Sequence, residues 1–199
     1  MNELHRPPSL PATTQAAEGL RRRRFTVAEI QSMVAGGIIS EDERIELIGG
    51  EVVPMSPKGR RHEVLRSELA FTLSRLCPAH LKVATETPLN LAADNAPEPD
   101  IIVFPASLKA PDVDGGSVLL VIEIADSSLA YDLSTKPSIY AAHGVREYRV
   151  INANTLDTTI HMEASGSGYR TVIAVAADKP LVPYLAPELG VRLADIELG

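Results

Sequence analysis

Residues 117–124 limit most strongly what this chain can fold into. Their sequence, S-V-L-L-V-I-E-I, is the most apolar run in the chain. A run without polar alternation predicts a strand that is buried on both faces of a sheet. Glu123 lies near the end of this run, where an ionised carboxylate is costly to bury without a partner. Two interpretations follow: the strand end reaches solvent and Glu123 pairs with an arginine, or Glu123 is a metal ligand or general acid/base.

Helical and strand patterns alternate along the rest of the chain, and most strands fall in the second half. This mixture predicts an α/β or mixed α+β domain. Apolar periodicity, caps and breakers place helices at 26–35, 59–76 and 136–143. Strands are expected at 44–48, 51–55, 82–86, 89–91, 100–104, 117–124, 147–152, 156–162 and 169–175, with irregular packing over 180–199.

The chain of 199 residues has the length of one domain. We assign residues 25–199 to it and expect residues 1–24, rich in Pro, Ala, Thr and Ser, to form a disordered tail. The run Arg21–Arg24 ends this tail and precedes no apolar stretch, so the tail does not resemble a secretory signal. No run has the ~18 apolar residues of a membrane span. The single cysteine, Cys77, excludes an internal disulfide. We therefore expect a cytoplasmic protein without membrane association.

The net charge of −7 is distributed unevenly. Of the 19 basic and 26 acidic residues, five arginines and two glutamates lie in residues 1–24, which leaves a net charge of −10 on the remainder. Such an acidic body does not suit a protein that contacts nucleic acid with its whole surface. The run Arg21–Arg24 can contact nucleic acid or anionic lipid, or form the solvated edge of the tail, which is the simpler interpretation.

Carboxylates in unusual positions are the main candidates for chemistry, since the chain lacks G-x-x-x-x-G-K-[ST], G-x-S-x-G and H-E-x-x-H motifs. Asp100 begins one predicted strand and Glu123 nearly ends the next. An antiparallel hairpin centred near Asp112 places Asp100 opposite Ile122 or Glu123. Two carboxylates so close require a cation or a raised pKa, and hard oxygen ligands suit Mg²⁺. Aspartate before a strand is also a common turn residue, which remains an alternative.

Lys136 is the third candidate. It begins the helix that follows the Glu123 strand, so it lies near the proposed carboxylate pair. A lysine there can hold a phosphate or orient a hydroxide, although a surface lysine is an adequate alternative. Asp132 is near in sequence, and Tyr140 lies one turn further on the same helix face.

Glu46 and His62 are weaker candidates. Glu46 alternates with Ile45 and Leu47, so it can equally be the solvent-exposed face of a strand. His62 opens the long helix within a basic cluster that contains Lys58, Arg60, Arg61 and Arg66. Ordinary helix-surface chemistry explains this cluster at least as well as phosphate contact does.

Residues 123–148 carry a specific pattern, E-I-A-D-S-S-L-A-Y-D-x-x-x-K-x-x-x-Y-A-x-x-G-V-x-E-Y, preceded by P-D-I-I-V from Pro99. The pattern resembles the Uma-type "putative restriction endonuclease" family of the PD-(D/E)xK nuclease superfamily. The similarity extends from about Phe25 to Glu197 and includes the hairpin at Glu46 and the helix that begins near His62.

The resemblance implies a restriction-endonuclease-like fold, in which helices flank a central mixed sheet. Asp100 and Glu123 match the metal-binding positions of the family. The carbonyl of Ile124 and the carboxylate of Glu46 would be further metal ligands. Lys136 matches the catalytic lysine, which this family carries on the following helix. His62, Asp132 and Tyr140 would support the site or contact phosphate. The implied activity is DNA cleavage that depends on Mg²⁺ or Mn²⁺, and a homodimer is expected because two sites cut both strands.

Three positions depart from the pattern. Ala125 stands where the superfamily usually has its lysine, Arg149 where the family usually has tryptophan, and Asn152 where it usually has aspartate. None removes a proposed ligand, but the changes at Arg149 and Asn152 can alter packing or the surroundings of the site. A metal-dependent endonuclease is the leading hypothesis. The alternatives are a catalytically inactive nuclease-like module that binds DNA or protein, and a structural homodimer with a vestigial site.

Overall fold

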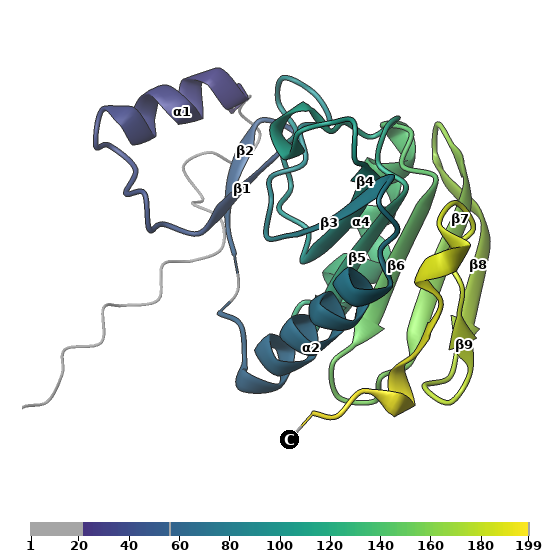
Figure 1. Cartoon of the computed structure of the whole chain (residues 1–199). Coiled ribbons are helices and arrows are strands. Elements are labelled where there is room, and N and C mark those ends of the chain that lie inside the picture. The colour runs from purple at the N-terminus through teal and green to yellow at the C-terminus, as the bar shows by residue number, and fades with distance from the viewer. Residues whose placement is uncertain (1–21, 56, 199) are drawn as a thin grey trace, which may run out of the picture.

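The computed structural model describes residues 22–55 and 57–198 (Figure 1). The predicted tail lies mostly outside the described residues, and its boundary at residue 24 stays a prediction. Four α-helices are present in the described part: α1 (Val27–Ala35), α2 (Arg60–Leu76), α3 (Leu129–Ser134) and α4 (Lys136–Ala142). None of them is long and apolar enough to cross a membrane.

The strands form one central sheet and two small ladders. The central sheet has the order β3-β4-β5-β6-β7-β8, formed by β3 (Leu81–Thr85), β4 (Ile101–Pro105), β5 (Leu120–Ala125), β6 (Glu147–Asn152), β7 (Thr158–Ser165) and β8 (Gly168–Val175). Of the neighbouring strand pairs in this sheet, only β5 and β6 are parallel, and the others are antiparallel. The ladders pair β1 (Ile45–Ile48) with β2 (Glu51–Pro54), and β9 (Pro180–Leu181) with β10 (Val191–Arg192). The predicted mixed sheet flanked by helices is confirmed.

Strand β5 is the centre of this sheet, as its apolar sequence predicts. All six of its residues are buried. Leu120, Ile122 and Ile124 belong to one hydrophobic cluster, whereas Val121 and Ala125 belong to a second cluster. Since side chains alternate along a strand, the two clusters cover opposite faces of the sheet.

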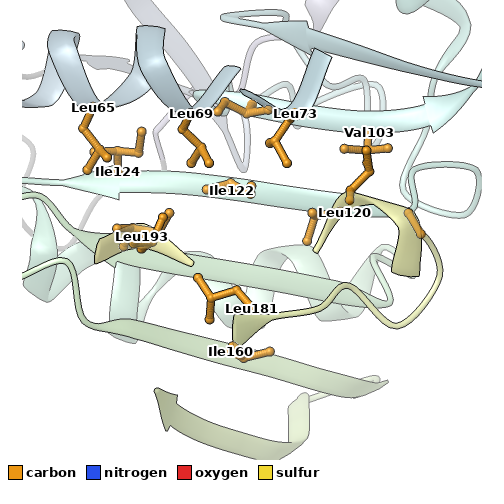
Figure 2. Close-up of a cluster of buried hydrophobic side chains, with 14 of the residues drawn as sticks. Leu65, Leu69, Leu73, Val103, Leu120, Ile122, Ile124, Ile160, Leu181 and Leu193 are labelled. Atoms are coloured by element: carbon orange, nitrogen blue, oxygen red, sulfur yellow. The ribbon is translucent and has the colours of Figure 1, made fainter. Parts of the chain in front are cut away.

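Different elements cover the two faces. Helix α2 packs on the first face through Leu65, Leu69 and Leu73 (Figure 2). The C-terminal segment covers the same face with Leu181 and Leu193 (Figure 2). On the second face, Tyr140 of α4 joins the cluster together with Ile102, Phe104, Tyr148 and Val150. Burial of this apolar area on both faces is the main stabilising contribution to the domain.

The hairpin of β1 and β2 turns at Gly49 and Gly50, whose φ angles are 58° and 79°. A two-residue turn with both φ angles positive matches the right-handed twist of the strands, and glycine adopts it without strain. Arg24 closes the turn, because its Nε donates to the Gly49 carbonyl at 2.8 Å and its guanidinium lies 2.6 Å from Asp94. Among the described arginines before α1, Arg22 also pairs with Glu51 and Arg23 with Glu29.

Replacing Gly50 tests this turn. A Cβ at Gly50 would lie 2.6 Å from the Cβ of Arg24. Together with the positive φ, this contact makes us expect Gly50→Ala to lower the free energy of unfolding by about 1–2 kcal/mol. Urea denaturation measures the change. In Gly166→Ala the new Cβ meets nothing within 4 Å, so equal stability losses in the two variants would contradict the turn geometry.

Several strand ends are shifted by a few residues from the predictions, such as the start of β5 at Leu120 instead of residue 117, and the secondary structure differs further in three places. Residues 89–91 form no strand, although Leu89 is fully buried, because their backbone runs as an irregular segment against 95–97. Helix α3 was not predicted; it is only six residues long and shows no apolar periodicity. The segment after residue 180 is irregular as expected, except for the short β9–β10 ladder.

His161 on β7 is buried beside aromatic rings, and its ring centroid lies 5.2 Å from that of Tyr148 and 5.6 Å from that of Tyr169. Burial lowers its pKa. Below about pH 6.5, the ordinary histidine pKa, the unfolded chain takes up a proton that the folded chain does not, so stability falls as the pH falls.

We therefore expect the unfolding free energy of the wild type to drop more steeply between pH 7 and 5 than that of His161→Phe. Chemical denaturation at several pH values measures the two slopes. The exposed His80 supplies the control, since His80→Gln should keep the wild-type slope. Parallel pH profiles for the wild type and His161→Phe would contradict this role.

Candidate active site

The register of the central sheet brings Asp100 next to the end of β5. Strands β4 and β5 pair antiparallel with Ile101 opposite Ile122, so Asp100, the residue before β4, comes opposite Glu123. The backbone N–H of Ile124 donates to Asp100 Oδ2 at 2.8 Å. Asp100 therefore lies opposite Glu123, one of the two positions that the hairpin geometry predicts, and both residues are buried, with 4% of each exposed.

Glu123 lies on the sheet face that α4 covers. Two side chains of α4 donate to its Oε1: Lys136 Nζ at 2.8 Å and Tyr140 Oη at 2.9 Å. Lys136 and Tyr140 are four residues apart, so they lie one above the other on one helix face. Both of these hydrogen bonds go to Oε1, so Oε2 is the Glu123 oxygen that is better placed to accept another ligand.

Lys136 also binds acidic residues from two other elements. Its Nζ donates to Glu46 Oε1 on β1 at 3.2 Å and lies 3.6 Å from Asp132 Oδ1 on α3. Glu46 Oε1 additionally accepts the backbone N–H of Glu98 at 2.9 Å. Lys136 is therefore the centre of a buried cluster of three carboxylates.

Asp100 is bound from a different side of the site. His62, in the first turn of α2, places Nε2 3.1 Å from Asp100 Oδ2. Lys58, just before α2, donates to Asp100 Oδ1 at 2.8 Å. Its Nζ also donates to Glu86 Oε1 at 2.7 Å, at the end of β3. Each oxygen of Asp100 thus accepts a hydrogen bond from a side chain.

These residues surround one cavity of about 300 Å³. All the predicted site residues except Tyr140 line it, and Tyr140 reaches the site through Glu123. The remaining walls come from the hairpin, from the segment before α2 and from the loop after β5. The cavity residues include Glu46, Lys58, His62, Asp100, Glu123, Ile124, Asp132 and Lys136.

Burial and charge set the protonation of the two central carboxylates in opposite directions. Burial alone would raise the pKa of Asp100, but His62 and Lys58 lower it to about 2. Burial raises the pKa of Glu123 to about 8; Lys136 opposes this rise, whereas the charges of Asp100, Asp132 and Glu46 add to it. Asp100 is therefore ionised at neutral pH, and the Glu123 carboxyl tends to hold a proton.

Lys136 carries the balancing charge. Its burial disfavours the ammonium, but Glu123, Glu46 and Asp132 outweigh this effect and raise its pKa. The neighbouring carboxylates add to the rise that burial causes in the pKa of Glu123. A divalent cation among these carboxylates would act in the opposite direction and favour the ionised form.

The donor set fits a hard divalent cation by its chemistry. Asp100, Glu123 and Glu46 offer carboxylate oxygens around one cavity that has space for water, which is the type of site that Mg²⁺ prefers. Within residues 22–55 and 57–198, however, no three His, Cys, Asp or Glu side chains already converge closely enough to hold an ion. Instead, Lys58 forms an ion pair with Asp100, and Lys136 forms ion pairs with Glu123 and Glu46.

The structure decides between the alternatives for the weaker candidates. Glu46 and His62 are each only 5% exposed, so neither is a solvent-exposed surface residue. Arg149 forms a buried ion pair with Glu147 and borders the cluster under α2, on the sheet face opposite Glu123. Asn152 Oδ1 accepts the backbone N–H of Asn154, which fixes the turn after β6.

Lys58 and Glu86 are the site residues that the sequence did not identify individually. Lys58 appeared only as a member of a basic cluster, and Glu86 only as the end of a predicted strand. The available signal was the position of Lys58 four residues before His62. That spacing gains meaning only when both side chains are seen to bind Asp100.

Comparisons with known proteins agree with this fold. A crystal structure from Anabaena variabilis ATCC 29413, described as a putative nuclease belonging to DUF820, superposes with a TM-score of 0.66 at 17% sequence identity. The match covers 86% of this chain and 96% of that one. Among curated proteins the comparison finds no significant match. The profile of the Uma2 family, described as "Putative restriction endonuclease", matches residues 28–194. The match spans most of the chain, and the protein therefore belongs to the Uma2 family.

Proposed function

We propose that this protein is a metal-dependent endonuclease that hydrolyses phosphodiester bonds of DNA. The observation that carries the proposal is the convergence of Asp100 and Glu123, from adjacent strands, on one cavity with Lys136. The order of these residues along the chain is that of a PD-(D/E)xK site whose lysine lies on the following helix. Membership of the Uma2 family and the nuclease-like fold support the same class of reaction.

Asp100, Glu123 and Glu46 would hold Mg²⁺ or Mn²⁺, with the carbonyl of Ile124 as a further ligand. When bound, such an ion lowers the pKa of a coordinated water and stabilises negative charge on a phosphate. Asp100 suits the role of a ligand because it is ionised and buried on a rigid strand end. The backbone N–H of Ile124 fixes the orientation of its carboxylate.

Lys136 would orient the attacking hydroxide or neutralise the scissile phosphate. It is suited to this role because the buried carboxylates keep it charged and hold its Nζ at a fixed point. Tyr140 keeps the Glu123 carboxyl in place, and Asp132 supports Lys136 from α3. His62 fixes Asp100 and borders the cavity, where it can also contact a phosphate.

The charge distribution restricts how DNA would approach. Two arginines near the site are already paired: Arg44 with Glu86 and Glu98, and Arg66 with Glu63 and Glu86. With a net charge of −7, the protein would attract DNA through local contacts at the metal and at Lys136, not through a broad basic surface. Binding should therefore depend strongly on the divalent ion.

A cleavage assay tests the proposal. The purified protein is incubated with supercoiled, linear and single-stranded DNA in Mg²⁺, in Mn²⁺, and in EDTA. We expect nicking or cutting with either metal and none with EDTA. A protein that binds neither metal and leaves every substrate intact would refute the assignment. Sedimentation of the same sample tests the homodimer, which stays a prediction from the sequence.

A non-catalytic nuclease-like module is the second candidate function. One observation favours it: Lys58 and Lys136 already form ion pairs with the proposed ligands Asp100 and Glu123 without a metal. The absence of a lysine at Ala125 agrees with this interpretation. Such a module would bind DNA or protein equally well in EDTA, whereas the endonuclease requires the ion.

A further inference from the structure

Lys58 lies between Asp100, which belongs to the proposed metal site, and Glu86, which lies outside it. Its Nζ is 2.8 Å from Asp100 Oδ1 and 2.7 Å from Glu86 Oε1, and only 9% of its side chain is exposed. It lines the same cavity as Asp100 and Glu123. An ammonium group so placed occupies a coordination position of the carboxylate that the proposed function assigns to the metal.

We propose that Lys58 is an internal counter-ion of Asp100 that competes with the divalent cation and moves onto Glu86 alone when the cation binds. This inference rests on the proposed function, because it concerns the same metal site. Asp100 Oδ2 already accepts from His62 and Ile124, so Oδ1 is the less occupied oxygen. Lys58 holds that oxygen, and two cations within a few ångströms repel each other strongly in a buried site.

Glu86 can remain the ion-pair partner of Lys58 when Lys58 leaves Asp100. Two arginines hold the Glu86 carboxylate independently of Lys58: Arg44 at 3.2 Å and Arg66 at 3.1 Å. The backbone N–H of Glu86 donates to the Asp100 carbonyl at 3.2 Å, and its φ of 48° is uncommon for a residue other than glycine. Glu86 therefore remains in position when Lys58 leaves Asp100, and the ammonium is never left unpaired.

Lys136, in contrast to Lys58, has no carboxylate partner outside the site among the described residues. Its partners Glu123, Glu46 and Asp132 all belong to the carboxylate cluster of the site. Lys58, in contrast, contacts one site carboxylate and one carboxylate outside the proposed ligand set. Of the two ammonium groups, Lys58 is therefore the one that a cation displaces.

Titration calorimetry of the metal-free full-length protein with Mn²⁺ tests the inference without a measurement of cleavage. Lys58→Met and Lys58→Gln remove the charge, Lys58→Arg keeps it, and Lys82→Met is the control on an exposed lysine of β3. We expect the two neutral variants to bind Mn²⁺ about tenfold more tightly, which is the order of effect that one charge has on a neighbouring carboxyl group. Lys58→Arg and Lys82→Met should keep the wild-type affinity.

The outcomes separate this inference from the proposed function. A gain in affinity cannot arise from general damage to the fold, and circular dichroism confirms that each variant is folded. If the wild type binds Mn²⁺ and both neutral variants bind it equally or more weakly, the counter-ion role is wrong and the endonuclease assignment stands. If neither the wild type nor any Lys58 variant binds Mn²⁺, both are wrong.

Discussion

Asp100→Asn is expected to abolish metal-dependent DNA cleavage, with a rate at least about 100-fold below that of the wild type, since even partners of metal ligands contribute 10- to 100-fold. The pKa of Asp100 is about 2, so this substitution removes a full negative charge at neutral pH. Asparagine keeps the size of the side chain and an oxygen that can accept from the N–H of Ile124. Initial rates with Mg²⁺ and with Mn²⁺ measure the effect.

This variant should remain folded, which makes its loss of activity informative. Lys58 keeps Glu86 as a partner when the charge at residue 100 is removed. The matched control is Asp178→Asn, which removes an exposed aspartate outside the cavity and should leave the rate unchanged. Cleavage by Asp100→Asn at the wild-type rate would exclude Asp100 as a metal ligand. Metal-independent DNA binding that survives the substitution would favour the non-catalytic module.

Lys136→Met is expected to cause the largest loss of stability among these variants, about 3 kcal/mol in the free energy of unfolding, because it leaves buried carboxylates without their cation. Lys136 is 6% exposed and lies within 3.6 Å of Glu123, Glu46 and Asp132. Methionine fills a similar volume, so the effect reports on charge more than on packing. Urea denaturation at neutral pH measures it.

Two further variants test the cause of this loss. Lys179 is a surface lysine with 65% of its side chain exposed, so Lys179→Met should change stability by no more than about 0.5 kcal/mol. Glu46→Gln removes one of the carboxylates that Lys136 binds, so the Glu46→Gln/Lys136→Met pair should lose less than the sum of the single changes. Additive losses would show that Lys136 and Glu46 do not interact energetically.

Much of the fold is predictable from local sequence. The apolar run at 117–124 contains most of the buried central strand, which spans Leu120–Ala125. Leu65, Leu69 and Leu73, spaced four residues apart, mark the buried face of α2. Gly49 and Gly50 mark the hairpin turn. These features follow from periodicity and from backbone conformation, which neighbouring residues determine. Residues 89–91 show the limit of prediction from local sequence. Leu89 is buried in a cluster with residues of other elements although its segment forms no strand, and such contacts depend on the tertiary structure.

The core of the candidate site is predictable for a related reason. Asp100 and Glu123 lie at the ends of strands that follow one another in sequence. Opposite residues of an antiparallel pair have residue numbers with a constant sum, which predicts that these two ends lie side by side. Tyr140 lies one helical turn from Lys136, and both contact Glu123 as their spacing allows. The resemblance to the Uma-type family pointed to the same residues and to Glu46.

The sequence by itself determined most of the elements, the family, and the position of Asp100 opposite Ile122 or Glu123. Only the tertiary structure decided that Glu46 and His62 are buried partners of the site, that Arg149 faces away from it, and that Lys58 holds Asp100. The reason is physical: Lys136 and Glu46 are 90 residues apart, and Lys58 and Asp100 are 42 apart. Contacts over such distances depend on how the layers pack around the sheet, which no local pattern of residues specifies.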